Sequence, residues 1–263
     1  MRYDCNLQKD AFLGMPASYE KKLDYLAQMA QHEEWTFQNK RKFGILDNYL
    51  SFTYDRLLQE EKIAFNADKE MCFNTGLLTT NNQDIYAYFE KNKNQNRPEG
   101  QKWYLSGFEK KSSRKLQYFS ALPTYADYFT NPDDFIFDRN KSLEIDWDHI
   151  VDDNEERFVE IGIIDKHQMK IMMKYAVELI LDKVKRNYKL AIPQFYTDKQ
   201  TNSSKIQLLL PLYLKDEITA NLALAVDKQT SQYVGKTILS LEWAYMNSRR
   251  ICKPAVDWLK IET

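Results

Sequence analysis

Two glutamines stand in segments whose other residues are mostly apolar and strand-like, Gln194 within residues 188–196 and Gln207 within residues 205–213. An amide in an apolar strand costs free energy unless another group hydrogen-bonds it, so both side chains need polar partners. Positively charged side chains close the helical segment just before them: Lys183, Lys185, Arg186 and Lys189. Amides beside cations predict a pocket for an anionic, planar and polar ligand such as a nucleotide. Cations at a helix end also complement the helix dipole, which is a structural explanation for the same charges.

The segment from Trp243 to Arg250 also combines aromatic, amide and guanidinium side chains. Guanidinium groups match phosphate, amides read base edges, and tyrosine rings stack on bases. The first hypothesis is therefore a nucleotide- or RNA-interacting protein, and an ordinary polar surface patch is its alternative. The predicted ligand-binding residues in this region of the chain are Arg186, Asn187, Gln194, Tyr196, Gln207, Asn247 and Arg249.

The step Asn74-Thr75-Gly76 ends another apolar run, and Asn74 and Thr75 are further predicted ligand-binding residues. An amide, a hydroxyl and free backbone N–H groups in sequence can bind a ligand. The same residues also suit an ordinary exit from a strand, because glycine permits a positive φ. Both interpretations stay open at this point.

An acidic cluster provides the second hypothesis, a metal-dependent phosphoesterase or nuclease acting on RNA or nucleotides. On an extended strand, the side chains of Glu144, Asp146 and Asp148 share one face. Three carboxylates are suitable ligands for Mg²⁺ or Mn²⁺, and His149 can act as a general acid or base beside Asp146 and Asp148. The alternative is the solvated face of an edge strand with a structural histidine.

Several familiar catalytic and cofactor-binding motifs are absent from the sequence. It contains no GxGxxG, Walker A, HExxH or GxSxG pattern, and its 7 glycines leave little material for a glycine-rich phosphate loop. These absences argue against an NTPase and against a dinucleotide-dependent dehydrogenase.

The periodicity of apolar residues predicts the elements that must position these groups. Helices are expected over residues 18–32, 45–61, 114–121, 124–130 and 166–186. Strands are expected over 63–65, 71–74, 84–89, 103–108, 143–147, 188–196, 205–213, 220–227 and 234–243. Because the strands come in consecutive groups, the pattern predicts an α+β fold with a mostly antiparallel mixed sheet flanked by helices. No linker divides the chain, so we expect one domain over 1–263, with a helical N-terminal region over 1–61 and a sheet-containing body over 62–263.

Composition gives a chain of 263 residues with 43% hydrophobic and 29% charged residues, as in soluble globular proteins. The net charge of −1 means that any contact with nucleic acid must come from a local patch. Three widely spaced cysteines and the lack of an 18-residue apolar run predict a cytoplasmic protein without a membrane segment. The third hypothesis is an interaction protein, a homo-oligomer whose aromatic strands form the interface.

Four segments of the sequence resemble a bacterial domain family of unknown function. They are Phe73-Asn-Thr-Gly-Leu77, Arg186 to Tyr196, Ile206 to Pro211, and Asn247-Ser-Arg249 before Pro254-Ala-Val-Asp-Trp258. Some members of that family are joined to cold-shock or LOTUS-type RNA-binding modules, so the resemblance implies a function that involves RNA. It implies no particular reaction.

Overall fold

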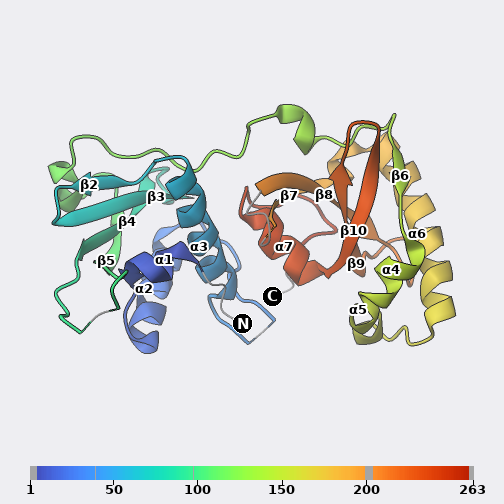
Figure 1. The fold of residues 1–263 in the computed structure, drawn as a ribbon, viewed down its shortest axis with the longest axis horizontal. Helices are drawn as coiled ribbons and strands as arrows, with labels where there is room; N and C mark the ends of the chain where they lie inside the picture. The colour runs from blue at the N-terminus through green and yellow to red at the C-terminus, as the bar shows by residue number, and fades with distance from the viewer. Residues whose placement is uncertain (1–4, 39, 97, 199–203, 261–263) are drawn as a thin grey trace. The chain divides into compact units, whose positions relative to one another are not determined.

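Alternating helical and strand-forming segments fold the chain into two α+β units, Met1–Asp127 and Tyr128–Thr263 (Figure 1). The structure is a computed structural model, and it describes residues 5–38, 40–96, 98–198 and 204–260. The predicted fold class, mostly antiparallel sheet flanked by helices, is confirmed. The expectation of a single domain stays a prediction. Among the described residues, no helix is long and apolar enough to cross a membrane.

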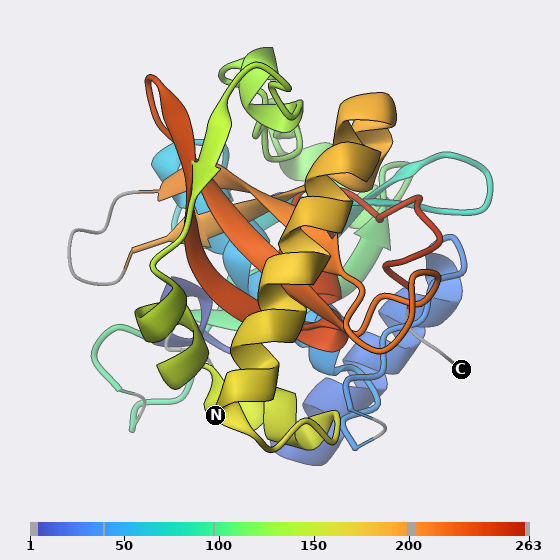
Figure 2. The same ribbon diagram turned by 90° about the vertical axis from the view of Figure 1, so that its right-hand side faces the viewer.

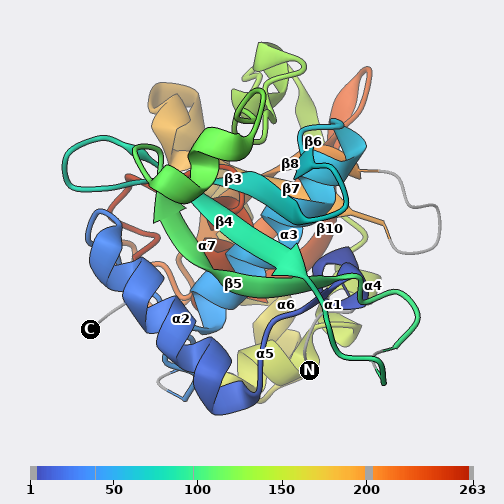
Figure 3. The same ribbon diagram turned by 90° about the vertical axis from the view of Figure 1, so that its left-hand side faces the viewer.

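The first unit builds one sheet from a four-stranded meander and a short strand from near the N-terminus. Within the described residues its strand order is β1-β5-β4-β3-β2, with only β1 and β5 parallel. The elements are α1 (Asn6–Asp10), β1 (Ala11–Phe12), α2 (Pro16–Met29), α3 (Gly44–Gln59), β2 (Ala64–Asn66), β3 (Glu70–Leu78), β4 (Asp84–Lys91), β5 (Trp103–Lys110) and the 3-10 turn η1 (Arg114–Tyr118). Figure 3 shows β3, β4 and β5 side by side, with α2 along β5.

The two faces of this sheet carry different cores. Phe73 of β3 packs against Tyr54 of α3 and against Phe89, with ring centroids 5.3 and 5.7 Å apart. On the opposite face, the buried cluster consists of Cys72, Tyr86, Tyr88, Leu116 and Phe119. Because side chains alternate along a strand, Asn74 shares the face of Cys72 and Tyr86.

The second unit repeats the same topology with different helices. Its described strands have the order β6-β10-β9-β8-β7, and again only the first strand, β6, is parallel to its neighbour. The elements are η2 (Pro132–Phe135), β6 (Ser142–Glu144), α4 (Trp147–Asp152), α5 (Glu155–Glu160), α6 (Lys166–Arg186), η3 (Tyr188–Leu190), β7 (Ile192–Thr197), β8 (Ser204–Leu212), β9 (Leu222–Lys228), β10 (Gln232–Ser240) and α7 (Leu241–Arg249). Figure 2 shows α6 crossing one face of this sheet.

Four predicted elements differ from the structure for identifiable local reasons. Residues 124–130 form no helix, and Pro132 begins η2 instead of ending one, with Asn131 accepting a hydrogen bond from the Asp133 N–H. The strand predicted over 143–147 ends at Glu144, because Asp146 caps α4. The strand predicted from residue 188 begins at Ile192, after η3. The strand predicted to reach residue 243 ends at Ser240, whose side chain caps α7.

Candidate functional site

The two buried glutamines are partners of each other. In the antiparallel pair β7–β8, Gln194 lies directly opposite Gln207, and the Gln194 Nε2 donates to the Gln207 Oε1 at 2.9 Å. The Asn247 Nδ2 of α7 donates to the Gln194 Oε1 at 3.1 Å. Only 2% of Gln194 and 4% of Gln207 are exposed. These three side chains, here called the amide cluster, therefore supply the hydrogen bonds that burial requires.

Helix α7 brings Asn247 to the sheet. The Ser240 Oγ accepts from the Trp243 N–H at its N-terminus, and Ala244 and Met246 are buried. Just beyond the helix, the Arg250 Nη1 donates to the Phe195 carbonyl at 3.1 Å, which ties this end to β7. Two polar contacts, Asn247 with Gln194 and Arg250 with Phe195, thus join this C-terminal region to β7.

The next cross-strand pair on the same face is exposed. Tyr196 lies opposite Lys205, two residues beyond each glutamine, so alternation along the strands places all four on one face. Tyr196 is 40% exposed, and the Lys205 Nζ is ion-paired with the Asp227 carboxylate of β9. The amide cluster with Tyr196 and Lys205 is here called the polar face.

Two residues of this arrangement are not among the predicted site residues, namely Lys205 and Asp227. Lys205 precedes Gln207 by two positions, so the period-two rule for strands places it beside the glutamine. Asp227 gives no such signal, because its position depends on how β8 pairs with β9.

The other predicted residues of this unit have local roles. The Arg186 side chain is exposed, and its Nη1 donates to the Asp182 carbonyl one turn back at 3.2 Å. The Asn187 Oδ1 accepts from the Lys189 N–H at the end of α6. Arg249 is buried in α7. Thus the structure joins Gln194, Gln207 and Asn247 directly by hydrogen bonds, places Tyr196 beside them, and bonds Arg186 to its own helix.

Asn74, Thr75 and Gly76 form an irregularity in β3, where the pairing with β4 shifts register between Asn74 and Leu78. The Thr75 Oγ1 donates to the Ile85 carbonyl at 2.7 Å, and the Tyr49 hydroxyl donates to the Thr75 carbonyl at 2.7 Å. The Asn74 Oδ1 accepts from the Gly76 N–H at 2.9 Å, while Gly76 has a φ of 74°. Both earlier interpretations of this step are compatible with a bulge that buries Asn74.

The acidic residues do not share a strand face. Glu144 ends β6 and accepts from the Gln232 Nε2, whereas Asp146 caps α4 by accepting from the His149 N–H. Asp148 is paired with Lys170, whose hydrogen bond and charge lower the pKa of the Asp148 carboxyl. The His149 Nε2 lies 3.0 Å from the Asp153 carboxylate, and both side chains are exposed. Within the described residues, no three His, Cys, Asp or Glu side chains come together as a metal-binding group. Metal-dependent catalysis stays a prediction.

Comparison with known proteins assigns the chain to a family. The sequence model of DUF3825, a domain of unknown function, matches residues 26–258, so the chain belongs to that family. The predicted resemblance to a family of unknown function is confirmed to this extent. No curated protein and no solved structure matches the chain.

Proposed function

We propose that this protein is a cytoplasmic protein that binds a nucleotide or a short stretch of RNA at the polar face of residues 128–263. The observation that carries the proposal is the sequence of groups along β7 and β8. Buried, hydrogen-bonded amides lead directly to an exposed tyrosine ring opposite a lysine. A ring of this kind can stack on a base while the ammonium group meets a phosphate.

The buried amides support this role by holding the exposed pair in place. A site on strands whose side chains are fixed by packing and hydrogen bonds is more precise than one on a loop. Arg186 and Asn187 lie at the end of α6 rather than on the polar face, where we propose them as additional phosphate and base contacts, and Arg249 is buried. The implied link of related bacterial proteins to cold-shock or LOTUS-type modules is a further support for RNA as the ligand.

A binding measurement with labelled pentaribonucleotides and free nucleotides tests the proposal. Stacking on an aromatic side chain contributes about 1–3 kcal/mol per base, so Tyr196→Ala is expected to weaken binding roughly 5- to 150-fold. Tyr196→Phe keeps the ring and should bind nearly as well as the native protein. Lys205→Gln and Arg186→Ala should each weaken the binding of RNA more than the binding of an uncharged nucleoside.

Tyr175→Ala is the matched control, because Tyr175 is an exposed tyrosine of α6 in the same unit. Its removal should leave affinity unchanged. Equal affinity of the Tyr196→Ala, Tyr175→Ala and native proteins would exclude the polar face as the binding site.

A further inference from the structure

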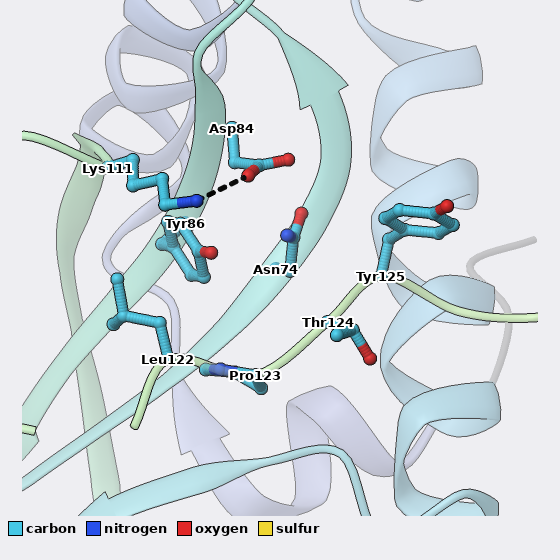
Figure 4. A pocket seen from close by; sticks show the side chains of 8 residues that line it. All are labelled: Asn74, Asp84, Tyr86, Lys111, Leu122, Pro123, Thr124 and Tyr125. Atoms are coloured by element: carbon cyan, nitrogen blue, oxygen red, sulfur yellow. Dashed lines mark ion pairs between the residues drawn. The ribbon is translucent and has the colours of Figure 1, made fainter. Parts of the chain in front are cut away.

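The first unit contains a hollow of about 420 Å³ beside the bulge in β3 (Figure 4). Its lining comes from β3, β4, the residue after β5 and the segment 122–125. This volume is within the range of roughly 300–1,000 Å³ found for small-molecule sites. All lining residues belong to Met1–Asp127, so the hollow is separate from the polar face.

The floor of the hollow is polar and buried. Asn74 and Tyr86 lie opposite each other in the β3–β4 pair, and each is only 2% exposed. The Asn74 Oδ1 is occupied by the Gly76 N–H, which directs the amide nitrogen elsewhere. Burial and the charge of Asp84 raise the pKa of Tyr86 to about 12, so its hydroxyl is neutral at physiological pH. The floor thus consists of an amide and a neutral hydroxyl that interact with each other.

The rim carries an acceptor beside a donor. The Asp84 carboxylate and the Lys111 Nζ are 3.7 Å apart, which is longer than a hydrogen bond, so both keep capacity for a ligand. Figure 4 shows this pair on one side of Asn74 and the Tyr125 ring on the other. Tyr125 is 61% exposed, and Leu122 and Pro123 add an apolar wall.

We propose that this hollow binds a single guanine base, with its Watson–Crick edge against Asp84 and Lys111 and its ring against Tyr125. Guanine presents two adjacent N–H donors, N1 and N2, which one carboxylate accepts together. Its O6 is an acceptor for the neighbouring ammonium group. Adenine and cytosine offer this carboxylate only their single exocyclic amino group. Aromatic and apolar walls around a base edge read by polar groups are the usual form of a single-base pocket.

The proposal goes beyond the proposed function, because it assigns a base-binding site to residues that the polar face does not include. The guanine could come from a free nucleotide or from single-stranded RNA, and the recognising chemistry is the same. The two sources are separated by the choice of probe.

Calorimetric titration of the full chain with guanosine, inosine and adenosine monophosphates provides the first arm. A bidentate contact discriminates between bases by roughly 10- to 100-fold, so the guanosine nucleotide should bind that much more tightly than the adenosine nucleotide. The inosine nucleotide lacks the N2 amino group and should fall between them. This arm needs no variant and therefore holds even if a substitution disturbs folding.

The second arm uses Asp84→Asn, which keeps the shape of the side chain but cannot accept both N–H groups. The preference for guanine over adenine should fall to about one. Lys110→Gln is the matched control, since Lys110 is exposed next to Lys111 and does not line the hollow; it should leave the preference unchanged. Titration with the RNAs UUGUU and UUAUU identifies the source, because only RNA-derived recognition requires the flanking nucleotides.

Equal affinity for the guanine and adenine probes, binding of neither, or a preference that survives Asp84→Asn would overturn the proposal. The Tyr196→Ala variant separates this result from the proposed function. It should weaken binding at the polar face while leaving the guanine preference of the Asp84 site intact.

Discussion

Gly76 shows how one residue shapes the hollow in the first unit. Its φ of 74° lies in the region that favours glycine, and a Cβ added there would lie 2.6 Å from the Tyr49 hydroxyl. That hydroxyl already donates to the Thr75 carbonyl. The glycine therefore allows a helix side chain to support the bulge that turns Asn74 toward Tyr86.

The variant Gly76→Ala is expected to lose about 2 kcal/mol or more of unfolding free energy, through backbone strain and displacement of Tyr49. Gly162→Ala is a suitable comparison, because its φ of 83° is also positive but nothing lies within 4 Å of the added Cβ. It should lose about 1–2 kcal/mol from strain alone. Urea denaturation of both variants measures the difference, and equal losses would contradict the role assigned to Tyr49.

At the residue level, the sequence predicts that buried amides need partners but not which partners they find. Gln194 and Gln207 lie in segments whose strand character is evident, so their burial could be anticipated. Their direct pairing depends on the β7–β8 register, which the pattern of a single sequence does not specify. Asn247 could not be placed beside them, because its position depends on a helix that the sequence pattern did not reveal.

At the level of elements, the sequence predicts a helix correctly where a long stripe of apolar residues with helical spacing is compatible with no other secondary structure. Helix α6 begins and ends at the predicted residues, because its buried stripe runs from Met169 to Val184. Helix α7 was missed because it follows a strand without any glycine or proline between them, and only the cap at Ser240 marks the change. The acidic cluster was misplaced for a similar reason, since Asp146 acts as a cap rather than a strand residue.

The amide cluster links three elements, so its substitutions should not be additive. Gln194 is the middle member, and Gln194→Leu leaves both Gln207 and Asn247 without their partner, at a cost of about 2–4 kcal/mol. Gln207→Leu removes one of the two bonds and should cost about 1–2 kcal/mol. The double variant should lose less than the sum of the two, as measured by a double-mutant cycle in urea. Strict additivity would show that the two side chains do not interact.

At the level of the whole molecule, the two units have one topology in common. Each consists of a short first strand, helices, and a four-stranded meander whose last strand lies parallel to the first. No internal repeat is visible in the sequence, and no change in composition marks the division after Asp127. Such a resemblance between units lies in strand pairing, which single-sequence patterns do not specify.

The net charge of −1 leads to a prediction about salt. A protein without a net positive charge can neutralise only the few phosphates that lie near residues such as Lys205 and Arg186. For single-stranded nucleic acid, the logarithm of affinity should fall with the logarithm of salt concentration with a slope of about −1 to −2. Fluorescence anisotropy with a labelled RNA between about 50 and 200 mM salt measures it. A slope steeper than about −4 would indicate an extended basic contact that the charge distribution does not support.

The parallel strands that complete each sheet have a consequence for how the chain acquires its fold. β1 pairs with β5, and β6 pairs with β10, across about 90 residues of sequence in each unit. Within each meander, consecutive strands pair as hairpins, and these short loops close at much lower entropic cost. Each meander should therefore assemble first and the short N-terminal strand should dock last. In both units the first strand, although synthesised before the others, can pair only after the last strand of the meander has formed its hairpin.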